Sequence, residues 1–212
     1  MQGSRISLRP PRSFDFALTA RVLRRSTRNL IDRVDEDGTW TRVVTLSRGP
    51  ALLRGRQHGA RITFDAAPAG AEDERTIQAL VTRLFSLDVE LAAFWRRVRR
   101  EPGFVELARR CRGLRPQQFP TLFEALVNGI CCQQLSLASG LTRLGHLAES
   151  FGPRTRDRAR PGPPDRDRVA DAPLSALRNA GLSIRRAGEL RELARMPLDR
   201  FEPELTSLCD QE

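Results

Sequence analysis

The chain has 212 residues, of which 40% are hydrophobic, and a formal net charge of +10. This hydrophobic share is enough to form a core and excludes a largely disordered chain. The charge favours a polyanionic partner such as nucleic acid. It does not establish one, because all 36 basic residues are arginine, a bias typical of a GC-rich coding sequence.

No signal for secretion or membrane insertion is present in the sequence. The first residues, MQGSRISLRPPRSFDF, lack the apolar core of a signal peptide. No apolar stretch approaches the roughly 20 residues that a membrane-spanning helix needs. These features predict a soluble cytoplasmic protein without a membrane partner.

The first 87 residues predict a small α+β domain. Residues 1–13 are polar and are expected to be a lead-in, and residues 13–23 suggest a strand that runs toward a short helix. Three short strands should follow, separated by turns at Asp37-Gly38, Gly49-Pro50 and His58-Gly59. Residues 71–87 then carry apolar positions at helical spacing and predict an amphipathic helix. Strands followed by a covering helix indicate an antiparallel sheet packed by helices.

From residue 88 onward the periodic segments are helical. Asp88 is expected to cap a helix, and Pro102 to open the next one. A helical pair around Gly181 and a last short helix after residue 200 should follow. We therefore divide the chain into an α+β domain at 1–87 and an α-helical domain at 88–212.

The segment 113–140 is the most informative part of the chain. Thr121, with Glu124 three residues later, predicts a capped helix ahead of an apolar run. A polar interruption at 132–136 should end this helix, and Ser136 should cap a second helix that reaches Phe151. The segment thus predicts two helices joined by a short polar turn.

Residues 153–168 stand apart because they lack large apolar side chains and contain four prolines. Such a segment cannot bury a core face, which predicts a mobile solvated loop. A basic arm along a DNA backbone is the alternative.

Metal and nucleophile chemistry is poorly supported by the sequence. The cysteines at 111, 131, 132 and 209 form no C-x-x-C pair, and Cys131 and Cys132 are expected to be small buried hydrophobes. His58 and His146 are the only histidines and are expected to be surface or half-buried residues. The acidic run 35–37 is a polar turn rather than a calcium loop. The arginine cluster at 95–100 predicts a solvated helix end, with a phosphate contact as the alternative.

Several stretches in the same order resemble the DNA-3-methyladenine glycosylase II family of the helix-hairpin-helix DNA glycosylase superfamily. The stretches are 14–44, 84–116, the segment 113–140, and LSALRNAGLSIRRAGELRELA at 174–194. The resemblance implies an N-terminal domain similar to half of a TATA-binding protein, followed by an all-α glycosylase domain. It also implies a monomer in the bacterial cytoplasm or nucleoid.

The resemblance further implies a base-excision repair enzyme that hydrolyses the N-glycosidic bond of alkylated purines. Such enzymes act on double-stranded DNA and flip the base out of the duplex, and the resemblance implies no cofactor. In the family a helix ending in G-Q-x-[VL]-S reaches the lesion. Here Cys132 replaces the glycine, Gln133 matches the glutamine, Gln134 falls at the wedge position and Ser136 matches the serine. The alternative is that both glutamines only satisfy backbone groups at a helix end.

Two later elements of the family have no match in this sequence. One is a Gly-x-Gly hairpin that grips a phosphate, and the other is an Asp that stabilises the cationic sugar. We therefore expect no catalytic residue within the chain, with the catalytic Asp beyond residue 212, and a helical domain that is incomplete at its C-terminus. A gene fragment, a partial sequence and a non-catalytic DNA-binding relative remain as alternatives.

Overall fold

The computed structural model describes residues 3–156 and 159–201, and they form two compact units. Unit 1 comprises residues 1–25 and 32–118, and unit 2 comprises residues 26–31 and 119–212. The expected domain boundary after residue 87 lies inside unit 1. The fold is α+β, with the sheet in unit 1 and helices in both units.

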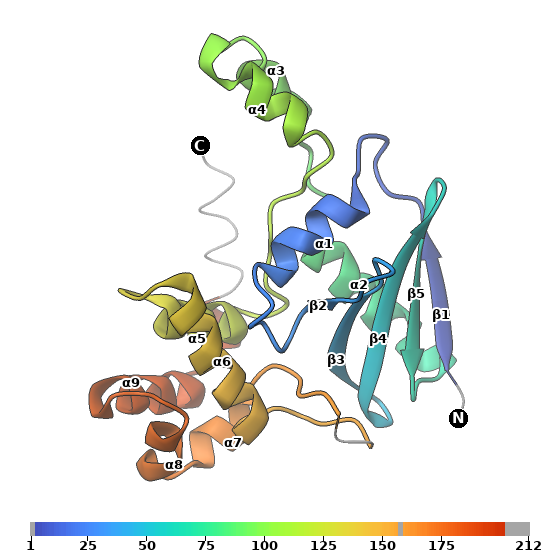
Figure 1. Ribbon diagram of the computed structural model, residues 1–212. Helices are drawn as coiled ribbons and strands as arrows, with labels where there is room; N and C mark the ends of the chain where they lie inside the picture. Colours follow the sequence, from blue (N-terminus) through green and yellow to red (C-terminus); the bar gives the residue numbers. More distant parts are fainter. Residues whose placement is uncertain (1–2, 157–158, 202–212) are drawn as a thin grey trace. The chain divides into compact units, whose positions relative to one another are not determined.

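Unit 1 is built on a five-stranded antiparallel sheet with the order β1-β5-β4-β3-β2 (Figure 1). The strands are β1 (Ser4–Leu8), β2 (Arg33–Val34), β3 (Trp40–Leu46), β4 (Gly49–His58) and β5 (Arg61–Ala67). The three predicted strands are confirmed as β3, β4 and β5. Gly38, Gly49 and Gly59 adopt positive φ angles of 79°, 96° and 56° at the tight turns that join β2 to β3, β3 to β4 and β4 to β5, a conformation that glycine adopts without steric cost.

The prediction for the first 24 residues was wrong in two ways. The expected lead-in contains strand β1, which pairs with β5 along its whole length. Residues 9–15 form no strand, and only the expected short helix is present, as α1 (Phe16–Arg24), which Asp15 caps by accepting a hydrogen bond from Leu18 N at 2.8 Å. Phe16, Ala20 and Leu23 recur at helical spacing and are all buried. The helical spacing of these apolar positions therefore determines the structure of the segment, although aromatic residues are also common in strands.

Helix α1 and helix α2 (Glu74–Leu84) supply the helical half of the unit 1 core. A 3₁₀ turn at Ala71–Asp73 leads into α2, and the expected amphipathic helix is confirmed. The ring of Phe85 lies at the centre of the core, 5.2 Å from the rings of both Phe16 and Trp40 between centroids. Buried residues of β3, β4 and β5 complete the cluster.

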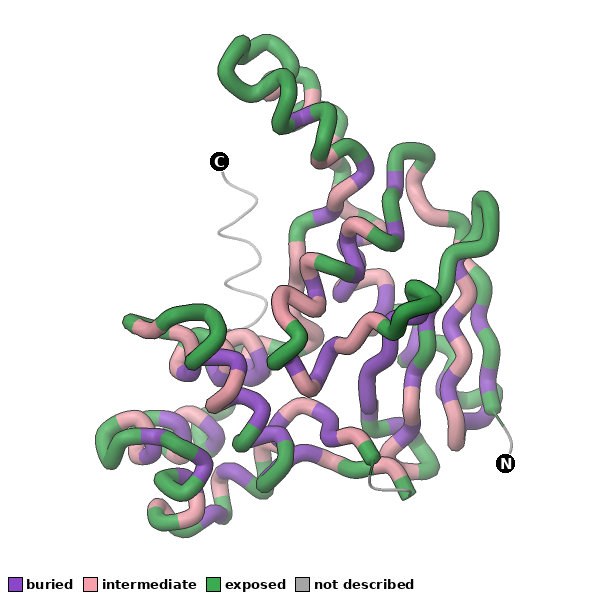
Figure 2. Tube along the Cα trace, in the orientation of Figure 1, coloured by how far each residue is buried: buried purple, intermediate pink, exposed green. Residues whose placement is uncertain are grey.

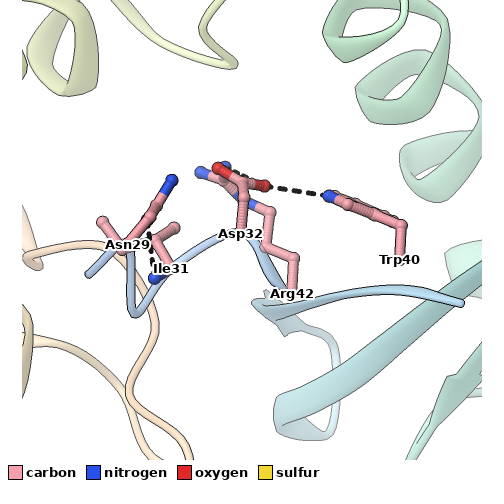
Figure 3. Close-up of polar contacts among 5 residues, drawn as sticks. All are labelled: Asn29, Ile31, Asp32, Trp40 and Arg42. Atoms are coloured by element: carbon pink, nitrogen blue, oxygen red, sulfur yellow. Dashed lines mark hydrogen bonds and ion pairs between the residues drawn. The ribbon is translucent and has the colours of Figure 1, made fainter. Parts of the chain in front are cut away.

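A buried ion pair lies beside this core (Figure 3). The Asp32 carboxylate accepts hydrogen bonds from Arg42 Nη1 at 3.0 Å and from Trp40 Nε1 at 3.2 Å. Both partners of the ion pair are nearly inaccessible to solvent, so each needs the other to offset the cost of burial. In unit 2, Asn29 Oδ1 accepts from the backbone N–H of Ile31 at 3.0 Å and turns the chain locally.

The rest of unit 1 is a short helical pair, α3 (Ala92–Val98) and α4 (Val105–Arg110), with a 3₁₀ turn at Pro102–Phe104 before α4. The pair is largely exposed (Figure 2). Pro102 opens its turn as predicted, but the prediction that Asp88 caps a helix was wrong. The helix begins after Leu91, which makes no side-chain capping bond.

Unit 2 is helical in its described part. Its helices are α5 (Leu122–Cys132), α6 (Leu137–Phe151), α7 (Arg166–Asp171), α8 (Leu174–Asn179) and α9 (Ile184–Arg195), followed by a 3₁₀ turn at Leu198–Arg200. One core joins them through buried residues such as Val127, Leu141, Leu177 and Leu190. The predicted helical pair around Gly181 is confirmed, and the short helix expected after residue 200 falls outside the described residues.

The segment 153–168, expected to be a mobile loop, carries local structure in its described part. Arg154 and Pro161 form an isolated antiparallel bridge, and Gly162 N donates to Pro153 O at 2.8 Å. Asp165 caps α7 by accepting from Arg168 N at 3.0 Å. Of the helices described, none is both long and apolar enough to cross a membrane.

Candidate functional site

The turn between α5 and α6 holds the residues that the sequence singled out. Helix α5 begins at the predicted cap, where Thr121 Oγ1 accepts from Glu124 N at 3.2 Å. It continues through both vicinal cysteines and ends at Gln133, whose ψ of 130° leaves the helical range. Ser136 then caps α6 by accepting from Ser139 N at 3.2 Å, as predicted. Gln133, Gln134 and Ser136 therefore lie together on one turn, and all three are exposed.

Gln134 has an unusual backbone. Its φ is 57°, in the left-handed region that residues other than glycine rarely adopt. Such a conformation costs on the order of 1 kcal/mol or more and persists only when the surroundings determine it. It often marks functional sites, which makes Gln134 the first residue to consider as a contact with a ligand.

The two helices approach each other very closely just behind this turn. A Cβ atom on Gly140 of α6 would lie 2.6 Å from Cys132 Sγ and 2.8 Å from Cys132 Cα. Only a residue without a side chain fits at position 140, because the side chain and backbone of α5 occupy the space. Gly140 thereby accommodates a cysteine at the position where the family pattern has glycine.

The first turn of α9 contacts the same α5–α6 turn. Arg186 Nη2 donates to the carbonyl oxygen of Gln133 at 2.8 Å. Ser183 caps α9 by accepting from Arg186 N at 3.3 Å, which fixes the start of the helix. Sequence reasoning missed Arg186, because the contact joins residues 53 positions apart.

Cys131 is a core residue rather than a nucleophile. Its side chain is fully buried, and burial raises the pKa of the thiol from 9.0 to about 12. The nearby charges of Arg143 and Arg186 act in the opposite direction on this pKa and are outweighed. The thiol is therefore protonated at neutral pH and unreactive, as expected for a small buried hydrophobe.

Other chemistry-bearing residues are dispersed. Among residues 3–156 and 159–201, no group of three or more His, Cys, Asp or Glu is placed to hold a metal ion. His58 and His146 are both exposed, as predicted. Cys111 and Cys132 are free thiols, and Cys209 lies outside the described residues.

Unit 1 contains a concave surface. The α3–α4 pair borders a groove of about 740 Å³ with an almost entirely apolar lining. Phe94, Phe104 and Leu107 line it, and each is more than half exposed. Exposed arginines surround these residues at positions 96, 97, 99, 100, 109 and 110. Arg97 and Arg109 form ion pairs with Glu101 and Glu106, at 3.5 and 3.0 Å.

Comparison with known proteins gives both a sequence match and fold matches. The sequence is 28% identical over 124 residues to a DNA-3-methyladenine glycosylase of Bacillus subtilis, which covers 58% of this chain and 40% of that protein. The chain thus spans less than half the length of the curated relative that it matches. No family model matches the chain.

The fold matches cover nearly the whole chain. A 3-methyladenine DNA-glycosylase from Archaeoglobus fulgidus superposes with a TM-score of 0.78 at 18% identity, over 92% of this chain and 67% of the other. The structure of MBOgg1 in complex with a low-affinity DNA ligand gives 0.69 at 18% identity, over 96% and 65%. These matches show that the chain has the fold of the two solved DNA glycosylases, and the curated relative is similar to it in sequence over 124 residues.

Proposed function

We propose that this chain is the lesion-recognising part of a base-excision repair DNA glycosylase of the 3-methyladenine type. The complete enzyme would hydrolyse the N-glycosidic bond of alkylated purines in double-stranded DNA after flipping the base out of the helix. The α5–α6 turn would meet the duplex at the lesion. In this assignment Gln134 fills the gap that the flipped base leaves.

The observation that carries the proposal is the geometry of Gln134. The residue is exposed at the tip of a turn between two packed helices, in a backbone conformation that costs free energy. A glutamine amide both donates and accepts hydrogen bonds, so it can pair with the orphaned partner base while it fills the gap. Gln133 and Ser136 flank it on the same exposed turn and would lie near the adjacent strand.

The charge around the turn supports an anionic partner. Arg143 and Arg186 lie close enough to Cys131 to act on its pKa. Phosphates of a duplex seated on the α5–α6 turn would therefore meet the positive charge of Arg143 and Arg186.

The comparisons support the choice of substrate class. The curated relative is named a DNA-3-methyladenine glycosylase, and one of the similar folds was solved with a DNA ligand. Alkylation gives a purine positive charge, which makes it a good leaving group. We therefore propose alkylated purines as the bases and water as the nucleophile, with no cofactor.

The test is the affinity of the 212-residue chain for two duplexes that differ only in one abasic-site analogue. We expect tighter binding to the abasic duplex, because a flipped-out state needs no unstacking there. Gln134→Ala should lower this preference about fivefold, the loss of roughly one net hydrogen bond. Gln134→Gly is the matched control, since it also lacks the amide but adopts the left-handed conformation freely. Equal abasic preference in the wild type and in both variants would contradict the proposal.

The main alternative is a non-catalytic DNA-binding module that uses the arginine surface. It predicts duplex affinity that falls steeply with salt, with a log–log slope of about −0.9 per phosphate contact, and no preference for the abasic duplex. A strong salt slope without abasic preference would therefore favour this alternative.

Base release is a separate question from recognition. The family resemblance assigns the sugar-stabilising Asp to a segment that no part of this sequence matches. We therefore propose that these 212 residues alone release no 3-methyladenine from methylated DNA above background. Clear turnover by the purified chain would place the catalytic group within it.

A further inference from the structure

The conformation of Gln134 depends on what holds its neighbours. Residue 134 has a φ of 57°, and the preceding residue, Gln133, has left the helical conformation with a ψ of 130°. The carbonyl of Gln133 therefore points away from the α5 hydrogen-bond ladder. A turn of this kind relaxes unless contacts from outside fix the peptide group between the two residues.

Arg186 supplies such a contact. Its Nη2 atom donates to the Gln133 carbonyl oxygen at 2.8 Å, and this carbonyl belongs to the peptide bond that links Gln133 to Gln134. The donor itself is well fixed, because Ser183 caps the start of α9 and Ala187 and Leu190 anchor the helix in the core. The guanidinium of Arg186 thus fixes the peptide plane that sets the φ of Gln134.

The opposite side of the turn is fixed by packing. Gly140 of α6 lies against Cys132, with no room for a side chain between them. The turn is therefore held by a steric contact on its α6 side and by a polar contact on its α9 side. Of these two contacts, only the polar one can be removed without disturbing the helix packing.

We propose that Arg186 is a positioning residue, which holds the Gln133–Gln134 peptide so that the Gln134 side chain is presented to the gap in the duplex. The inference rests on the proposed function and adds a residue to it. The competing role for an arginine beside DNA is a direct contact with a phosphate. The two roles differ in their chemistry, since a phosphate contact needs the charge, whereas the positioning contact needs the planar fork and reach of the guanidinium.

The test compares Arg186→Lys with the wild type for binding to the intact and the abasic duplex, at several salt concentrations. Lysine keeps the charge and binds phosphate well as a point charge, but lacks the guanidinium geometry. We expect the abasic preference to fall about fivefold, as for the loss of one net hydrogen bond, with an unchanged salt slope. Retained preference in Arg186→Lys, or a loss of affinity equal on both duplexes, would overturn the inference.

Two further variants make the test specific. Arg185→Met is the matched control, because Arg185 lies beside Arg186 but pairs with Glu189 at 2.8 Å within α9. It should leave the abasic preference unchanged, and a fall as large as that in Arg186→Lys would overturn the inference.

In a Gln134→Ala background, Arg186→Lys should have no further effect on abasic preference, because the presented side chain is already gone. A full additional loss there would show that Arg186 acts independently and would overturn the positioning role.

Recovery of the abasic preference in Arg186→Lys by a second substitution would distinguish positioning of residue 134 from a general structural role. Asparagine tolerates the left-handed conformation better than glutamine and keeps the amide. Adding Gln134→Asn to Arg186→Lys should therefore restore part of the abasic preference, and no recovery would count against positioning. If the wild type itself shows no abasic preference, the proposed function fails. If the wild type and Gln134→Ala behave as expected but Arg186→Lys keeps the abasic preference of the wild type, only this inference fails.

Discussion

The helical pairs α3–α4 and α5–α6 are built on opposite plans. In α5–α6 most of the large apolar side chains face inward, with Phe123, Val127 and Leu141 buried, although Leu126 and Leu137 are exposed. In α3–α4 the only buried residue is Ala108, while Phe94 and Leu107 are more than half exposed. The first pair therefore has most of its apolar surface covered, whereas the second pair exposes most of it.

The packing of each pair determines whether it can hold a polar group in a fixed position. A tightly packed pair can hold a strained residue such as Gln134 at its tip, because its core stabilises the helices on both sides. A pair whose apolar side chains are exposed cannot fix a polar group so firmly, and its surface consists of a groove with arginines around it. Polar recognition is therefore expected at the α5–α6 tip.

The largest expected effect compares one leucine from each pair. Leu141→Ala in α6 should lower the free energy of unfolding by about 2–5 kcal/mol, because it leaves a cavity in the core. Leu107→Ala in α4 should change it by less than about 0.5 kcal/mol, since this side chain is already exposed. Urea unfolding of both variants measures the difference, and equal losses would contradict the opposite plans of the two pairs.

The next effect concerns the close approach of α5 and α6. Gly140→Ala should destabilise unit 2 by about 1–3 kcal/mol, because the new methyl group overlaps Cys132. The control is Gly188→Ala in α9, where a Cβ atom meets nothing within 4 Å. That change should stabilise the helix by roughly 0.5–1 kcal/mol. Thermal unfolding of the two variants would refute the packing argument if Gly140→Ala is neutral.

An alkaline titration tests the burial of the Cys131 thiol in α5. The pKa of Cys131 is raised from 9.0 to about 12 in the folded chain, so above pH 9 the unfolded chain loses this proton first. Stability should therefore fall as pH rises from about 9 toward 12, by up to about 1.4 kcal/mol per pH unit from this group. Cys131→Ala should flatten the fall, and an unchanged slope in this variant would contradict the assignment.

At pH 8 the thiols of Cys111 and Cys131 should differ in reactivity. Cys111 lines the α3–α4 groove and is partly exposed, whereas Cys131 is fully buried. Iodoacetamide labelling followed by peptide mass spectrometry should modify Cys111 in the folded chain and leave Cys131 intact. Labelling of Cys131 at a comparable rate would show that the α5–α6 core opens readily.

The smallest effect on stability is expected for the groove itself. Replacing Phe104 and Leu107 with glutamine should reduce the fluorescence of the dye ANS on the folded chain, because such dyes bind exposed apolar surface. The free energy of unfolding should change by less than about 0.5 kcal/mol for each replacement. An unchanged dye signal together with a large loss of stability would show that these side chains are packed rather than exposed.

Features set by local chemistry were predictable from the sequence. The caps at Thr121 and Ser136 depend on residues three positions away, and the three central strands depend on alternation and on glycine turns. Strand β1 was missed because a five-residue edge strand gives a weak pattern and Pro10-Pro11 follows it. Asp88 resembled a helix cap in sequence, but the helix begins only after Leu91.

The candidate site was predictable only in part, for a physical reason. The wedge position of Gln134 followed from a motif, whereas its left-handed backbone and its support by Arg186 depend on tertiary contacts. The α3–α4 groove was missed because helical periodicity reveals an apolar face without revealing whether anything covers it. The similarity of the N-terminal domain to a TATA-binding protein remains a prediction.

The central claim, that the α5–α6 tip meets the lesion, is tested most directly by disulfide cross-linking. A Gln134→Cys variant would be mixed with a duplex that carries a thiol tether at the abasic position. Glu189→Cys in α9 and the wild type serve as controls for a remote thiol and for the native cysteines. We expect a rapid cross-link that peptide mapping assigns to position 134. Cross-linking at position 134 no faster than at position 189 would contradict it.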